Sequence, residues 1–166
     1  MKVHYEGSEK IPASHADVWA FMNTPEKVAA CLPDVVSTTV ADPTHFTSVV
    51  KVGVGPVRGN FTFQVTLEPK PDAKQILVSI HGGGLGSVVD QVATATLRDD
   101  GTGTTTLDWS ADAVINGPVA TVGGRILDAQ AKRIIEHVFT RVRESLTSVA
   151  PASASVAPER SSGSTA

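Results

Sequence analysis

Hydrophobic and polar positions alternate most clearly between Val57 and Glu68. The odd positions of this segment are apolar or glycine, and the even positions are polar or charged. A period of two predicts a β-strand with one face against the core and the other in water. Any binding function is therefore to be sought on the apolar face, which carries Phe61, Phe63 and Val65.

Further strands are predicted over residues 2–11 and between residues 35 and 116. Turn-forming sequences divide the second region: Asp42-Pro43, Gly55-Pro56, Pro69 to Asp72, Gly82-Gly83-Gly84 and Asp99-Asp100-Gly101. Because most of these connections are too short for a crossover helix, neighbouring strands are expected to pair antiparallel. The pattern predicts an antiparallel sheet of six or seven strands.

Two short helices are predicted directly after the first strand. Ser14 with Asp17 resembles a capping box at the start of one of them. Thr24 as N-cap and Pro25 as the first helical residue begin the other, which ends near Leu32.

A long C-terminal helix is predicted from Pro118 to about residue 148. Apolar residues recur there at three- and four-residue steps, which is typical of an amphipathic helix, and its length would be about 45 Å. Gly123 and Gly124 fall inside it, where each costs roughly 1 kcal/mol relative to alanine. They indicate space left for a ligand, a close backbone approach, or a kink.

The composition fits one domain over residues 1–148. The chain has 166 residues, of which 41% are hydrophobic, enough for a core without disulfides. Residues 149–166 are rich in alanine, serine and proline, so we expect a disordered tail that resembles a linker to a further membrane or protein anchor.

Charge and cysteine content exclude several classes of function. The net charge is −3, without the clustered Lys and Arg of a nucleic-acid-binding face. The single Cys31 has no partner for an internal disulfide, and the start of the chain lacks a signal-peptide pattern, so we expect a cytoplasmic protein. No apolar run reaches about 18 residues, which leaves peripheral membrane contact open but not a helical span.

Candidate reactive groups are few. The histidines at positions 4, 15, 45, 81 and 137 lack the i, i+4 spacing of a zinc helix, so no metal site is expected. The glycine-rich stretch 82–86 lacks the Lys-Ser/Thr of a phosphate-binding loop. His81 and Asp90 would meet across this stretch either as an acid–base pair or as a surface hydrogen bond.

Several short motifs resemble those of the CoxG family of carbon monoxide dehydrogenase proteins, within the START-like (SRPBCC) superfamily, from residue 2 to about residue 145. The matching positions are Ile11-Pro12-Ala13, Val18-Trp19, Pro25-Glu26, Cys31-Leu32-Pro33, Gly55-Pro56-Val57 with Gly59 and Phe61, Gly82 with Gly84, and Gly117 with Gly123 and Arg125. Asp34 stands where the family usually has glycine, and Val138-Phe139 where it often has two aromatics.

The resemblance implies an α+β helix-grip fold. In that fold a curved antiparallel sheet wraps a long C-terminal helix and leaves an elongated apolar cavity, which in this superfamily holds lipids, sterols, polyketides or similar molecules. The resemblance also implies association with an aerobic carbon monoxide dehydrogenase, a molybdenum enzyme, and with its attachment to the cytoplasmic face of the membrane.

These implications predict a non-enzymatic carrier that links the dehydrogenase to the membrane. Electrons leaving such an enzyme for respiration must reach a lipid-soluble quinone, so menaquinone or ubiquinone is the first candidate ligand, with no covalent cofactor. The predicted ligand-binding residues are Leu32, Phe61, Phe63, Val65, Leu85, Trp109, Val122, Gly123 and Ile126.

Two alternatives remain open at the level of sequence. A cyclase- or hydrolase-type enzyme would need His81, Asp90 or Asp112 to project into the cavity. A ligand-free scaffold would instead use the outer face of the last helix, where Lys132, Arg133, Arg141 and Arg143 would meet anionic lipid or an acidic partner.

Overall fold

The sheet has seven strands in the computed structural model, which describes residues 1–152. Every neighbouring pair is antiparallel, and the spatial order is β1-β7-β6-β5-β4-β3-β2. The predicted antiparallel sheet is thus confirmed at the upper end of the expected strand number. The strands are β1 (Lys2–Ile11), β2 (Val35–Asp42), β3 (His45–Val54), β4 (Val57–Lys70), β5 (Gln75–Gly84), β6 (Ser87–Asp99) and β7 (Thr105–Asn116).

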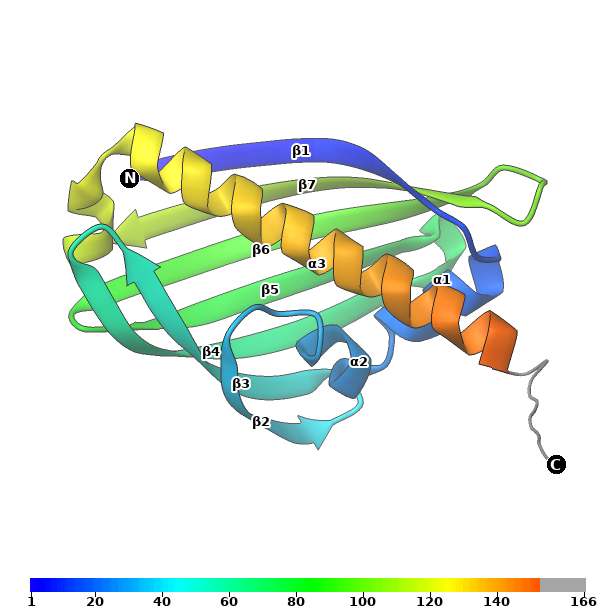
Figure 1. Ribbon diagram of the computed structural model, residues 1–166, viewed down its shortest axis with the longest axis horizontal. Coiled ribbons are helices and arrows are strands. Elements are labelled where there is room, and N and C mark those ends of the chain that lie inside the picture. The colour runs from blue at the N-terminus through cyan, green and yellow to red at the C-terminus, as the bar shows by residue number, and fades with distance from the viewer. Residues whose placement is uncertain (153–166) are drawn as a thin grey trace, which may run out of the picture.

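One long helix crosses the inner face of this sheet, and shorter helices lie near its two ends (Figure 1). The Asp17 amide donates to Ser14 Oγ at 3.2 Å, and Pro25 is the first residue of the second short helix, as the capping patterns predict. The helices are α1 (His15–Met22), α2 (Pro25–Ala29), the 3₁₀ helices η1 (Pro71–Ala73) and η2 (Pro118–Val122), and α3 (Gly124–Ala152).

The long helix begins later than its apolar periodicity predicts. Residues 118–122 form η2, and Gly123 then adopts a φ of +95°, in the left-handed region that glycine enters without steric cost. Nothing lies within 4 Å of the place where a Cβ of Gly123 would stand. Gly123 is therefore a joint between η2 and α3, and its predicted place inside the helix is wrong.

The glycines assigned to a turn belong to β5. A Cβ on Gly82 would stand 2.0 Å from the Thr62 carbonyl oxygen, and one on Gly83 would stand 1.9 Å from that of Ser87. Only glycine permits such close approach of the neighbouring strands. The turn itself is formed by Leu85 and Gly86, with φ values of +54° and +81°.

The buried core is divided into two clusters. The first lies at the end that holds α1 and α2 and includes Phe21, Phe46, Leu97, Leu107 and Val142. The second lies at the end that holds η2 and consists of Val50, Val54, Val57, Phe61, Val119 and Leu127. Since a domain of this size usually has one contiguous core, the division directs attention to the part of the inner face between the clusters.

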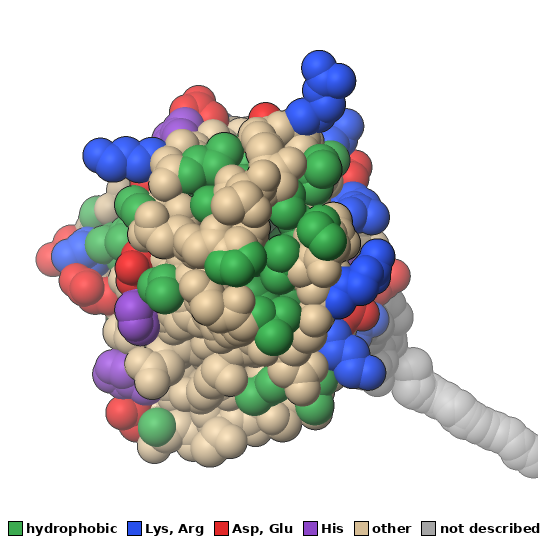
Figure 2. All heavy atoms as spheres, turned by 90° about the vertical axis from the view of Figure 1, so that its left-hand side faces the viewer, with side chains coloured by type: hydrophobic (Ala, Val, Ile, Leu, Met, Phe, Trp, Pro, Cys, Tyr) green, Lys and Arg blue, Asp and Glu red, His purple; other side chains and the backbone are tan. Residues whose placement is uncertain are grey.

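The end of the molecule that holds η2 has hydrophobic side chains on its surface, as Figure 2 shows. At the other end α3 runs to Ala152, so it includes the first residues of the predicted tail, and residues 153–166 lie outside the described part. Within residues 1–152, no helix combines the length and apolar character needed to cross a bilayer.

Candidate ligand-binding site

Inward-facing side chains in the middle of the sheet are only partly covered by α3. Strand register aligns two rows on this face: Val65, Ile80, Gln91, Ala113 and Val3, and beside them Leu67, Val78, Ala93, Ala111 and Tyr5. The two β4 residues are buried, whereas the other eight keep part of their surface exposed. We take this partial exposure as a sign of open space between the sheet and α3, which we call the central gap; Val3, Ile80, Gln91 and Ala113 also line a depression on the outer face of the sheet.

Short side chains contribute to the central gap on both layers. Ala93, Ala111 and Ala113 lie on the sheet, and Ala131 of α3 follows the buried Leu127 by one turn. Because protein interiors are otherwise close-packed, these alanines leave volume that larger side chains would fill. Ala95, two residues along β6 on the same face, is only 6% exposed and belongs to the first cluster.

Aromatic side chains border the gap toward the first cluster. Trp109 packs against Phe139 of α3 with ring centroids 6.0 Å apart. Its indole ring covers Gly7, where an added Cβ would approach Nε1 to 3.1 Å. The buried Nε1 of Trp109 has no hydrogen-bond acceptor among the described residues.

Tyr5 joins β1 to α3 at the side of the gap. Its hydroxyl donates a hydrogen bond to Asp128 Oδ1 at 2.8 Å. Burial, followed by the hydrogen bond to this carboxylate, raises the pKa of Tyr5 to about 12. The phenol is therefore a neutral, already engaged donor at physiological pH.

The lining of the gap is suited to an apolar ligand that carries few polar atoms. The Gln91 amide and the Tyr5 hydroxyl are the polar side-chain groups in the two central rows, and the remaining members are aliphatic. Pockets for small hydrophobic molecules typically combine such an apolar wall with a small number of polar groups that set orientation.

The three predicted residues of β4 lie on its inner face, as strand alternation predicts. Phe61 is buried in the second cluster and Val65 in the first, while Phe63 is partly exposed between them. The Phe61 and Phe63 ring centroids are 6.0 Å apart. Of the three, Phe63 has free surface beside the gap.

The other predicted residues are spread along the molecule. Leu32 packs against the first cluster and Val122 against the second, both half-buried. Leu85 and Ile126 are 53% and 44% exposed. Together with Gly123 they lie at the end of the molecule that holds η2, outside the two central rows, and their role in ligand binding stays a prediction.

Several residues of the gap are missing from the sequence prediction. They are Val78, Ile80, Gln91, Ala93, Ala111, Ala113 and Phe139. The signal that identifies the strand residues is the register of the antiparallel hairpins, since residues paired with Val65 and Leu67 must share their face.

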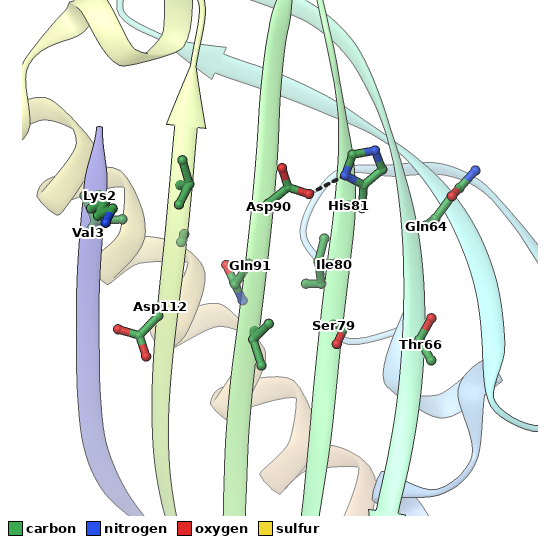
Figure 3. Close-up of a pocket in the computed structure, with 13 residues that line it drawn as sticks. Lys2, Val3, Gln64, Thr66, Ser79, Ile80, His81, Asp90, Gln91 and Asp112 are labelled. Atoms are coloured by element: carbon green, nitrogen blue, oxygen red, sulfur yellow. Dashed lines mark hydrogen bonds and ion pairs between the residues drawn. The ribbon is translucent and has the colours of Figure 1, made fainter.

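The candidate acid–base residues lie on the opposite face of the sheet, which Figure 3 shows from the side away from α3. An open depression of about 570 Å³ there is lined by His81, Asp90, Asp112 and neighbouring residues of β1 and β4 to β7. His81 Nδ1 is hydrogen-bonded to Asp90 Oδ1, and both side chains are more than half exposed. Asp112 Oδ1 meets His4 Nδ1 at 2.7 Å. None of these carboxylates or imidazoles faces the central gap.

The remaining polar chemistry offers no cluster for a metal ion. Within residues 1–152, no three His, Cys, Asp or Glu side chains come together in a way that would hold one. Cys31 is buried within the first cluster, and burial raises the pKa of its thiol to about 11, so it is a neutral thiol at physiological pH.

Solved structures share this architecture at low sequence identity. A conserved protein from Geobacillus kaustophilus aligns with a TM-score of 0.80 at 18% identity, covering 88% of this chain and 96% of that one. A START superfamily protein from Mycobacterium smegmatis gives 0.68 at 14%, covering 88% and 98%. Zhui aromatase/cyclase from Streptomyces sp. R1128 gives 0.68 at 13%, covering 94% and 100%. These likenesses establish a START-like helix-grip fold.

Sequence comparison adds the family. No curated protein gives a significant match. The family model for CoxG of carbon monoxide dehydrogenase matches residues 7–147, which include all seven strands in whole or in part, both short helices and most of α3. The chain belongs to the carbon monoxide dehydrogenase CoxG family.

Proposed function

We propose that this protein is a non-enzymatic carrier that holds a hydrophobic ligand in the central gap. The observation that carries the proposal is the division of the core into two buried clusters with partly exposed, mainly aliphatic side chains between them. An apolar molecule in this place would remove those side chains from water, with a favourable free energy of about 25 cal/mol per Å² of apolar surface buried.

A respiratory quinone is the first candidate ligand. The family name associates such proteins with carbon monoxide dehydrogenase, an oxidoreductase whose electrons need an acceptor. A quinone has an apolar ring and tail with two carbonyl oxygens, which fits an aliphatic wall that offers the Gln91 amide as a donor. In this proposal the protein works at the cytoplasmic face of the membrane and links the dehydrogenase to it.

The position of the acid–base candidates favours a carrier over an enzyme. His81, Asp90 and Asp112 lie on the outer face of the sheet, so they do not reach a molecule held in the gap. A general acid or base must come within hydrogen-bond reach of the proton that it transfers. The Zhui protein, which is named an aromatase/cyclase, shares the fold at 13% identity, and this carries no activity over to this chain.

Two alanines of β6 provide a test with a built-in control. Ala93→Leu places a larger side chain in the gap, whereas Ala95→Leu places the same side chain in the packed first cluster. Ala93→Leu should weaken binding of ubiquinone-1 at least tenfold with little change in melting temperature. Ala95→Leu should cost roughly 1–3 kcal/mol of stability through overpacking.

Binding is followed by quenching of tryptophan fluorescence, since Trp109 borders the gap, and stability by thermal unfolding. Native mass spectrometry with lipid extraction identifies whatever copurifies with the wild type. An Ala93→Leu protein that binds ubiquinone-1 as tightly as the wild type, or that melts as early as Ala95→Leu, would show that protein atoms fill the gap.

A further inference from the structure

Four chain segments meet at the end of the molecule that holds η2. Atoms of Met1 and Val122 lie 3.7 Å and 3.4 Å from the places where side chains of Gly124 and Gly55 would begin. Pro118 of η2 lies 3.7 Å from the corresponding place at Gly86. We call the surface formed by residues 1–3, 53–59, 84–88 and 114–127 the η2 end.

Large hydrophobic side chains are concentrated on the η2 end. Five of the nine exposed ones in the described residues belong to it: Met1, Leu85, Val88, Val114 and Ile126. Figure 2 shows hydrophobic side chains in the middle of this surface, with Lys and Arg side chains along the side of α3. Exposed apolar groups gathered in this way mark an interaction surface more often than scattered ones do.

Leu85 is held at the tip of the β5–β6 turn in an unfavourable backbone conformation. Its φ of +54° lies in the left-handed region, which is sterically unfavourable for any residue other than glycine. The side chain leans over Gly59 of β4, where an added Cβ would approach Leu85 Cδ1 to 2.7 Å. The fold thus keeps a large aliphatic group in water at a position where glycine would be less strained.

The charged side chains within the four segments of the η2 end have a single sign; Asp90, Asp112 and Asp128 lie within two residues of the segments and are hydrogen-bonded to His81, His4 and Tyr5. The segments contain Lys2, Arg58 and Arg125 and no Asp or Glu, although the whole chain has a net charge of −3. None of the three forms an ion pair within residues 1–152. Exposed aliphatic groups combined with unpaired cations complement a bilayer surface that contains anionic lipid.

We infer that the η2 end docks on an anionic bilayer, with Leu85 and Ile126 entering the interface and Lys2, Arg58 and Arg125 meeting lipid phosphates. The inference rests on the proposed function, which gives the docking a purpose. A water-insoluble ligand passes most easily from the bilayer to the central gap when the two are in contact. The second cluster closes the gap at this end, so docking here brings the bilayer next to the gap. This location differs from the α3 surface around Arg141 and Arg143.

Vesicle flotation with the full chain tests the inference. The vesicles are phosphatidylcholine alone, or phosphatidylcholine with phosphatidylglycerol. The wild type should bind the mixed vesicles, and added salt should weaken that binding. Arg58→Glu with Arg125→Glu should lower the partition coefficient roughly tenfold or more, because each basic residue near the surface contributes about 1 kcal/mol. Leu85→Ser should weaken binding as well.

Two controls locate the surface. Arg141→Glu, on α3 toward the opposite end, and Val92→Ser, exposed on the outer face of β6, should bind like the wild type. Failure of the wild type to bind mixed vesicles, as expected if an acidic protein is the partner, would overturn the inference. Equal binding by the Arg58/Arg125 variant, or loss of binding in Arg141→Glu, would overturn it too.

The ligand assay keeps this inference separate from the proposed function. Arg58→Glu with Arg125→Glu should bind ubiquinone-1 in solution like the wild type, whereas Ala93→Leu should lose that binding and still float with mixed vesicles. Loss of vesicle binding by Ala93→Leu would place the bilayer contact elsewhere. Normal vesicle binding without any binding of ubiquinone-1 would contradict the quinone proposal alone.

Discussion

Gly123 and Gly124 are adjacent in sequence but meet opposite conformational demands. Gly123 has a φ of +95°, whereas Gly124 is the first residue of α3, where a Cβ would make an ordinary contact 3.7 Å from Met1. Gly123→Ala should therefore destabilise the protein by about 1–2 kcal/mol through left-handed strain. Gly124→Ala should be neutral or stabilise it by up to about 1 kcal/mol. Denaturant unfolding of the two variants measures the difference, and equal midpoints would contradict the assignment of the joint.

The same conformation changes what a larger residue at Gly123 would do. The sequence pattern predicts that Gly123→Leu improves helix propensity while filling ligand space. Because the residue lies outside the helix and open space surrounds it, a leucine there would strain the backbone and project away from other atoms. Gly123→Leu is consequently a poor probe of the ligand site, and Ala93→Leu replaces it.

Tyr5 gives a spectroscopic measure of its contact with α3, because the chain contains a single tyrosine. Its pKa, raised to about 12, means that the folded state favours the neutral phenol. This contribution to stability is fully present below the ordinary pKa of 10 and is lost as the pH rises toward 12.

Asp128→Asn should lower the pKa of Tyr5, because the carboxylate no longer opposes formation of the phenolate. The pKa should nevertheless stay above its ordinary value, since burial is the larger cause of the shift. Titration of tyrosinate absorbance in the wild type and in Asp128→Asn provides the check. Identical titration curves would mean that the hydrogen bond to Asp128 does not persist in solution.

Some residues of the central gap can be predicted from the sequence pattern and others cannot. Alternation in β4 is strong because Phe61, Phe63 and Val65 are separated along the chain by polar residues. The face that they share is therefore predictable from this one strand. Ala93 and Ala111 give no such signal, since alanine occurs on both faces of a sheet. Ala93 and Ala111 belong to the gap because of the side chains beside them and the helix above them. Those neighbours depend on the register of three strands and on the position of α3.

At the scale of elements, η2 has the features of a hinged cap. Glycines with φ of +89° and +95°, Gly117 and Gly123, bound it on each side. Its Val119 lies in the second cluster, and the Val119 amide donates to Ser87 Oγ at 3.0 Å. A short segment that, within residues 1–152, is joined to β6 by this hydrogen bond and otherwise held by apolar contacts and local hydrogen bonds is among the parts of a fold that open at low cost.

A disulfide from η2 to the β3–β4 turn should close this end. The Cβ of Val122 lies 3.8 Å from the place of a Cβ on Gly55, which suits a disulfide. In a Cys31→Ala background, oxidised Gly55→Cys/Val122→Cys protein should take up ubiquinone-1 more slowly than the same protein after reduction, as measured by stopped-flow fluorescence. The Gly55→Cys single variant controls for strain at a φ of +57°. Equal uptake rates before and after reduction would show that the ligand enters elsewhere.

Most elements follow from local sequence signals, and the exceptions have a common cause. Ser14 and Thr24-Pro25 mark the starts of α1 and α2 through capping, which depends on a few neighbouring residues. Pro118 begins a helix in the structure too, but this helix is the short 3₁₀ helix η2 and not the start of α3. The apolar spacing of η2 continues that of α3, so the sequence pattern does not reveal the break at Gly123. A glycine in the sequence indicates that its backbone is free to adopt unusual conformations. It does not indicate whether that freedom serves a turn, a break between two helices or the close packing of strands.

At the scale of the whole molecule, a family resemblance contributes what periodicity cannot. Strand and helix counts are compatible with several α+β arrangements, and the wrapping of the sheet around α3 depends on contacts between distant segments. The match over residues 7–147 and the shared architecture of the solved structures establish that arrangement. The quinone, the dehydrogenase partner and the boundary of the domain at residue 148 remain predictions.

The division of the core also bears on how such proteins diverge. Buried clusters at the two ends stabilise the fold, while the residues between them bury less surface and contribute less to folding. Mutations in the middle of the molecule are therefore under weaker selection for stability and free to alter the shape of the space. If the proposed function holds, a few substitutions there would change which ligand fits, at little cost to stability.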